Sequence, residues 1–123
     1  MGWKIWVDVF WFVQAKEEVL DFVTHHKEKL AEIWEKAKML SGLRGCTITI
    51  EVASEYVRSL GGDRDEYLEL YVAISRDGVL SCFVDDVVYD QTANIGREER
   101  ICLAQLRIEE TETSAIEIVE ANR

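Results

Sequence analysis

The order of apolar and polar positions first predicts a strand and then a long helix. From Trp3 to Val13 every second residue is apolar, and the opposite face of this segment is half apolar as well. Between Val19 and Leu40, apolar residues recur every three or four positions, which predicts one long helix over residues 15–40 with a single buried stripe. Ser41-Gly42 supplies a stop signal for that helix.

After Gly45 the period changes to two, which is typical of strands that have one buried face. Residues 46–53 and 67–74 both alternate in this way, and Gly78 lies in the turn that follows. A three-residue loop with a left-handed Gly78 pairs Leu70 with Val84, whereas a two-residue loop pairs Leu70 with Asp85. The first register keeps one face of the hairpin apolar, so we predict that register.

The last third of the chain is less regular. Residues 85–99 show no clear period, so we expect an irregular segment there. Residues 102–109 alternate again and predict a strand with Cys102, Ala104, Leu106 and Ile108 facing inward. Helix is the alternative for this run, because its residue types favour helices. Residues 115–119 form either a closing strand or a terminal helix capped by Ser114 and Glu117.

These elements predict one α+β domain over residues 1–123. An N-terminal strand precedes one long helix, which packs across a curved antiparallel sheet of four to six strands. This element order resembles the cystatin-like architecture, in which one helix lies in the concave face of such a sheet. The cystatin inhibitory loops resemble Gln-x-Val-x-Gly and Pro-Trp, and neither pattern occurs in this sequence. We therefore carry over no protease inhibition from the resemblance.

Charge changes the picture of possible partners. The chain has 24 Asp and Glu against 14 Lys and Arg, a net charge of −10, and residues 43–123 account for −9 of it. Nucleic acids and anionic membrane surfaces would repel such a protein, so we expect neither as a partner. The sequence shows no signal-peptide pattern and no long apolar run, and its three cysteines are unclustered. These features predict a cytoplasmic protein with reduced thiols.

One histidine and three cysteines are the candidates for catalysis. His26 lies on the apolar stripe of the helix, so it is a candidate general base for a Cys–His pair with whichever of Cys46, Cys82 or Cys102 lies within reach. The alternative is an ordinary histidine at the edge of the core. We expect no metal site and no cofactor, because the helical trio of Asp21, His25 and Glu28 lacks a further ligand.

The predicted outer face of the sheet is the candidate for binding a partner. Glu51, Glu69 and Asp85 should point away from the helix together with three aromatic residues, Tyr67, Tyr71 and Phe83. Acidic residues around aromatic side chains suit a basic protein partner, because the aromatic groups give contact area and the charges steer association. The alternative is an ordinary solvated sheet face.

The aromatic first strand suggests self-association. One helix covers one face of the strand, which leaves Trp6, Phe10 and Phe12 to be covered by a second chain, as in a dimer, or by residues 115–119. We therefore expect a non-catalytic, dimeric module that docks a basic protein, a profile that immunity, antitoxin and inhibitor proteins share. The alternative is a small-ligand protein or enzyme with a pocket between helix and sheet, lined by His26, Trp34, Tyr56 and the inward cysteines.

Overall fold

The computed structural model describes residues 2–42, 45–92 and 96–121 as one six-stranded sheet with two helices on one face. Its order is β2-β3-β4-β5-β1-β6, and every neighbouring pair is antiparallel except β1 and β6. The α+β class is confirmed. The strands are β1 (Gly2–Val9), β2 (Ile48–Gly61), β3 (Arg64–Ile74), β4 (Leu80–Asp90), β5 (Arg97–Thr111) and β6 (Ile116–Glu120), and the helices are α1 (Lys16–His25) and α2 (Lys27–Leu40).

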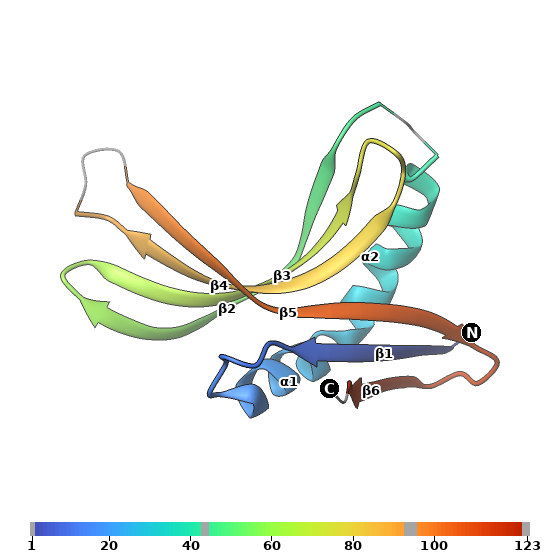
Figure 1. The fold of residues 1–123 in the computed structure, drawn as a ribbon, viewed down its shortest axis with the longest axis horizontal. Coiled ribbons are helices and arrows are strands. Elements are labelled where there is room, and N and C mark those ends of the chain that lie inside the picture. Colours follow the sequence, from blue (N-terminus) through green and yellow to red (C-terminus); the bar gives the residue numbers. More distant parts are fainter. Residues whose placement is uncertain (1, 43–44, 93–95, 122–123) are drawn as a thin grey trace.

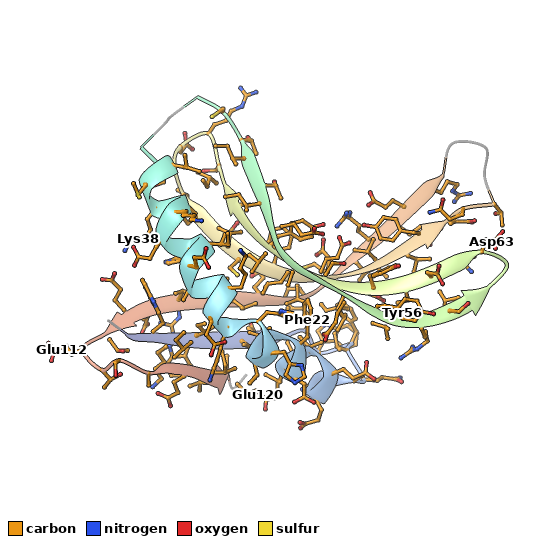
Figure 2. The ribbon with its side chains drawn as sticks, turned by 180° about the vertical axis from the view of Figure 1, so that it is seen from behind. Phe22, Lys38, Tyr56, Asp63, Glu112 and Glu120 are labelled. Atoms are coloured by element: carbon orange, nitrogen blue, oxygen red, sulfur yellow. The ribbon has the colours of Figure 1, made fainter. Side chains whose placement is uncertain are left out.

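The sheet is strongly twisted. Strands β2, β3 and β4 run from one arm of the molecule to another, whereas β5 leaves them near the centre and continues beside β1 (Figure 1). One arm lies beside α2. The other, which we call the distal arm (residues 54–67, 86–92 and 96–100), projects beyond the helices, with Tyr56 and Asp63 on it (Figure 2). Register shifts interrupt β2 at three places and the β4–β5 ladder at one. Such bulges bend a strand and increase its twist, so they shape this sheet.

The hydrophobic core lies between the helices and the sheet face that they cover. The expected apolar face of β1 is confirmed, with Ile5 and Val7 fully buried. On the sheet side of the core, apolar residues of β3 and β4 pack beside those of β1. On the helix side, the core is formed by the predicted apolar stripe. The largest fully buried apolar side chains of the core are Phe22, Ile5, Leu30, Leu70 and Ile74.

The expectation of one long helix over residues 15–40 is imprecise, because two helices, α1 and α2, cover this range and are separated at His26. The backbone there has φ −115° and ψ 18°, outside the helical region. The His26 amide still donates to Val23 O at 3.2 Å, and its carbonyl accepts from the Leu30 amide at 2.9 Å. Both helices contact β3 and β6, whereas β1 is contacted mainly by α1 and β2 mainly by α2. Two shorter helices can follow the twisted sheet, whereas one straight helix of the same length would lose contact with part of it.

The predicted β3–β4 register is confirmed. Leu70 lies opposite Val84, and Ile74 lies opposite Leu80. Gly78 has φ 81°, and a Cβ at this position would lie 2.5 Å from Ser41 O. Only glycine both adopts this positive φ readily and lacks the Cβ that would clash with Ser41. Gly78 therefore allows the β3–β4 hairpin to approach the end of α2 closely.

The last third of the chain is more regular than its pattern suggests. Strand rather than helix is confirmed for residues 102–109, which belong to β5. The segment over residues 85–99 is not irregular, because β4 continues to Asp90 and β5 begins at Arg97; residues 93–95 lie outside the described part. The C-terminal alternative resolves as a strand, β6, which pairs in parallel with β1. No helix in the described ranges is long and apolar enough to cross a bilayer.

Candidate functional site

The six residues expected to bind a partner lie together on the sheet face opposite the helices, which we call the helix-free face. Glu51, Tyr71 and Phe83 face one another across β2, β3 and β4. Glu69 lies opposite Asp85 one step further along, and Tyr67 follows Glu69 on the same face. The strands therefore gather residues that are up to 34 positions apart into one continuous surface.

Two of the acidic residues on this face are nevertheless buried. Glu69 is 1% exposed and Asp85 is 7% exposed, although the sequence pattern led us to expect both to face solvent. No second layer covers them among the described elements. Instead, the large side chains around them exclude water, and a buried carboxylate then requires hydrogen-bond donors and a counter-charge.

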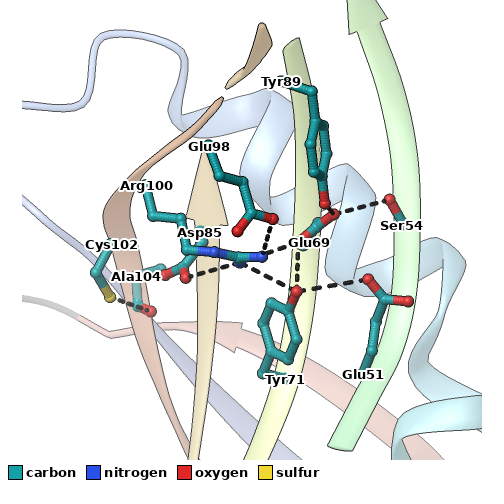
Figure 3. A network of polar contacts seen from close by, with 10 residues as sticks. All are labelled: Glu51, Ser54, Glu69, Tyr71, Asp85, Tyr89, Glu98, Arg100, Cys102 and Ala104. Carbon is teal, nitrogen blue, oxygen red and sulfur yellow. Dashed lines mark hydrogen bonds and ion pairs between the residues drawn. The ribbon is translucent and has the colours of Figure 1, made fainter. Parts of the chain in front are cut away.

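The Glu69 carboxylate has such donors on several sides (Figure 3). It accepts hydrogen bonds from the Tyr89 hydroxyl at 2.6 Å, from the Tyr71 hydroxyl, and from Arg100 Nη1 at 3.0 Å. The Ser54 hydroxyl donates a weaker bond at 3.4 Å. β2, β3, β4 and β5 each contribute one or more of these groups, so the network ties four strands together.

Arg100 is the cation of this network, and sequence reasoning missed it. Its guanidinium also donates to the Tyr71 hydroxyl at 3.0 Å and to Glu98 Oε1 at 2.8 Å, and it lies 3.6 Å from Asp85 Oδ2. The carbon centre of the same group lies 5.3 Å from the centroid of the Tyr71 ring. Arg100 lies between the segment that we expected to be irregular, residues 85–99, and the predicted strand over residues 102–109, so its face could not be assigned from the pattern.

The pKa shifts in this cluster follow from burial and from these contacts. Burial alone would raise the pKa of Glu69, but hydrogen bonds from Tyr71 and Tyr89 and the charge of Arg100 together lower it below its ordinary value. Burial, supported by the bond to Glu69, raises the pKa of Tyr71 to about 12. Burial also raises the pKa of Tyr89 and, against the charge of Arg100, that of Asp85. Glu69 is therefore ionised at neutral pH, and the tyrosines keep their protons.

This chemistry suits binding better than catalysis. A fully hydrogen-bonded carboxylate is a poor general base, and a phenol with a raised pKa is a poor nucleophile. In front of the network lies a shallow pocket of about 240 Å³ lined by Thr49, Tyr71, Phe83, Asp85 and Arg100. The rings of Tyr71 and Phe83 stack with their centroids 5.6 Å apart. The result is a rigid surface of aromatic rings with charged groups around it.

The catalytic candidates are spread over different parts of the fold. The His26 ring packs on Phe22 with centroids 5.1 Å apart, and its Nε2 lies 4.0 Å from Glu55 Oε2. Cys82 is buried in the core, and burial raises the pKa of its thiol. Within the described ranges, His26 makes no contact with a cysteine that the structure records, and a thiol with a raised pKa is a weak nucleophile.

Two of the cysteines do not face inward as expected. Cys46 is exposed and precedes β2. Cys102 lies opposite Asp85 on the helix-free face, because the register shift between Val84 and Asp85 changes which β5 residues face the helices. Burial, and then the nearby Asp85, raises the pKa of the Cys102 thiol.

The residues expected to mediate self-association are only partly exposed. Trp6 lies on β1, which is paired on both sides by β5 and β6, and its ring is flanked by Lys4 Nζ at 4.4 Å and by the Arg107 guanidinium at 4.9 Å. Phe10 is half-buried, and Phe12 is 45% exposed. β6 pairs with the edge of β1 and does not lie over its face. Self-association stays a prediction, which analytical ultracentrifugation would test.

In the parts of the chain that the structure describes, no three histidine, cysteine or carboxylate side chains come together as metal ligands. Comparison of the chain with protein-family models, with curated proteins and with solved structures finds no match.

Proposed function

We propose that the chain is a small acidic binding module that docks a basic protein partner on its helix-free face. The observation that carries the proposal is the charge on this face over β2, β3, β4 and residues 97–105 of β5. Among the described side chains there, a single arginine, Arg100, opposes five carboxylates, which belong to Glu51, Asp65, Glu69, Asp85 and Glu98. A positively charged partner complements this surface, whereas an acidic one is repelled.

Aromatic side chains supply the contact area that such a docking face needs. Tyr56, Tyr67 and Tyr89 form a row across three strands, with neighbouring ring centroids 5.5 and 5.4 Å apart. Tyr56 is 55% exposed, so this row reaches the surface of the distal arm. Lysine and arginine side chains of a partner can stack on these rings as well as pair with the carboxylates.

The Glu69 network contributes rigidity. It holds the hydroxyl ends of Tyr71 and Tyr89, so these rings are already ordered before a partner arrives. An ordered side chain loses less conformational entropy on binding, which favours affinity. The role of Glu69 in this proposal is therefore to position the docking face rather than to contact the partner.

The test is an affinity capture from the native host with two matched double variants. E51K/Y56S reverses a charge and removes an aromatic ring on the helix-free face. E35K/M39S reverses a charge and removes a large apolar side chain on the exposed side of α2, where Met39 is 82% exposed. We expect the unmodified chain and E35K/M39S to capture the same basic protein, and E51K/Y56S to lose it. Capture should also weaken at high salt.

Direct titration of the purified chain and its variants with the captured partner then tests the proposal. A loss of affinity of about tenfold or more in E51K/Y56S, with E35K/M39S within about twofold, supports docking on the helix-free face. Equal affinity of the two variants, or a captured partner that is acidic, contradicts it.

A further inference from the structure

A second candidate site lies on the other side of the sheet, where the start of α1 meets the base of the distal arm. A cavity of about 350 Å³ lies there between the segment Phe12–Ala15, the first turn of α1 and strands β2 to β5. This volume is at the small end of the range for small-molecule sites, about 300–1,000 Å³. Neither His26 nor a cysteine lines the cavity, so it differs from the pocket that the sequence suggested.

The walls of this cavity are largely apolar. α1, β2 and β3 contribute Val19, Val57 and Leu68, and β5 contributes Ile101 and Leu103. Two large apolar side chains of the lining, Phe12 at 45% and Ile101 at 56%, are exposed to solvent. The cavity therefore opens to the surface between apolar groups, which suits a ligand with a compact apolar body.

One side of the cavity holds a pair of carboxyl groups. Asp86 on β4 lies opposite Leu68, two residues from Glu66 on β3, so the two acids are diagonal neighbours on one face. Arg58 Nη1 lies 3.1 Å from Glu66 Oε1. Asp86 makes no ion pair with the described residues. Its contact with the Glu66 carboxyl is a hydrogen bond only while one of the two groups is protonated, and Asp86 Oδ1 is buried without another donor among the described side chains.

This arrangement leaves Asp86 incompletely satisfied. Burial, together with the neighbouring Glu66 carboxyl, raises the pKa of Asp86 to about 6. Three carboxyl groups line the cavity, those of Glu18, Glu66 and Asp86, against one cation, Arg58. A buried acceptor with no donor is unfavourable, and a bound ligand that donates an N–H would remove that cost.

We propose that this cavity binds a small primary amine with a compact apolar body. The ammonium group donates a hydrogen bond to Asp86 Oδ1, and its positive charge offsets the repulsion between the Asp86 and Glu66 carboxylates. The apolar body lies against Val57, Leu103 and Ile101. Anions are repelled by the same carboxyl pair, and the donor requirement favours an ammonium over a cation without N–H groups. The site lies on the sheet face opposite the docking face, so this inference stands apart from the proposed function.

Binding should strengthen as the pH rises through the titration of Asp86, because the ammonium and the proton compete for the same oxygen. The charged groups of the cavity are Glu66 on β3, Arg58 on β2 and Glu18 on α1, and β5 contributes only the apolar Ile101 and Leu103 to its lining. A primary amine stays protonated throughout this range, so the change in affinity reports on the carboxyl pair.

The test is a calorimetric titration of the full chain with 2-phenylethylamine and three matched probes. 2-Phenylethanol carries no charge, 3-phenylpropionate carries a negative charge, and phenethyltrimethylammonium carries a positive charge without an N–H. We expect the amine to bind at pH 7 at least about tenfold more tightly than each of the others. Failure of the amine to bind, or equal binding of the trimethylammonium probe, overturns the proposal.

Substitutions then test whether Asp86 and Glu66 form the amine site. Asp86→Asn should weaken amine binding about tenfold and remove its dependence on pH between 5 and 7. Asp63→Asn is the matched control, because Asp63 is exposed in the β2–β3 turn at φ 61°, a conformation that asparagine adopts readily. Glu66→Gln is a second test and should also weaken binding. Amine affinity that is unchanged in both Asp86→Asn and Glu66→Gln refutes the site.

Discussion

Two glutamates three residues apart on β3 have opposite environments. Glu69 faces away from the helices and accepts hydrogen bonds from Tyr71, Tyr89 and Arg100. Glu66 faces the helix side, where Arg58 is its ion-pair partner and Asp86 is its acidic neighbour. The pKa of Glu69 is lowered, whereas on the helix side the pKa of Asp86, the acidic neighbour of Glu66, is raised to about 6.

The two clusters show that burial alone does not decide whether a carboxyl group is charged. Desolvation raises the pKa in both clusters, and the supply of donors decides the outcome. The Glu69 network is complete within the chain and therefore acts as a structural element. The Glu66–Asp86 pair is incomplete, which is why we assign it to a ligand.

The largest effect should follow from removal of the cation that completes the Glu69 network. Arg100→Met leaves Glu69 and Asp85 buried without a counter-charge, so we expect a loss of about 3–5 kcal/mol in the free energy of unfolding at pH 7. Urea unfolding followed by tryptophan fluorescence measures it. Arg97→Met is the control, because Arg97 forms an exposed pair with Glu99 and should cost about 0–1 kcal/mol. Similar losses in both variants would show that Glu69 does not depend on Arg100.

A gain of stability should follow from neutralising the incomplete pair. The pKa of Asp86 is raised from 3.8 to about 6, so the folded state binds the proton more tightly than the unfolded chain does. Stability therefore falls between these two pH values and stays reduced above them. Asp86→Asn removes this loss, and because the site is only partly desolvated we expect a gain of about 1–2 kcal/mol at pH 7.

The pH dependence distinguishes this cause from a general packing effect. Near pH 4 the folded protein already has Asp86 protonated, so the gain in Asp86→Asn should almost disappear. Urea unfolding of the variant and the unmodified chain at pH 4 and pH 7 measures the difference. A gain of the same size at both pH values would mean that ionisation of Asp86 is not its source.

The smallest effect should come from a single hydroxyl of the Glu69 network. Tyr89→Phe removes one donor to a charged acceptor while keeping the ring, so we expect a loss of about 1–2 kcal/mol in unfolding free energy. Tyr67→Phe is matched to it, because the Tyr67 hydroxyl makes no hydrogen bond recorded among the described residues while its ring contacts Tyr89. Thermal unfolding followed by circular dichroism compares the two variants. Equal stability of Tyr89→Phe and Tyr67→Phe would show that the Tyr89 hydroxyl does not stabilise the network.

The pattern of the sequence predicts the parts of the fold that depend on local period. The buried face of β1, the helical stripe from Val19 to Ala37 and the β3–β4 register around Gly78 all follow from it. Burying one face of an element forces its apolar positions into register, so these features are visible without a structure. The grouping of Glu51, Glu69, Tyr71 and Phe83 on one face follows from the same alternation.

Features that arise between elements were not predictable in this way. The helix break at His26 has no proline or glycine to mark it, and it separates two helices that pack on different strands of a twisted sheet. The bulge between Val84 and Asp85 places Cys102 on the opposite face from its apparent period. Glu69 and Asp85 have the pattern of solvated residues but are buried, because burial by neighbouring side chains depends on strands far apart in the chain.

Periodicity and composition establish the α+β class, a strongly acidic second part of the chain and one aromatic, acidic sheet face. Which of those acids are charged emerges only in the folded chain, because it depends on donors from other strands. Arg100 reaches Glu69 across 31 positions, and Asp86 reaches Glu66 across 20. Hydrophobic periodicity acts within an element, whereas the ionisation of a buried carboxyl group depends on all the groups that surround it in space.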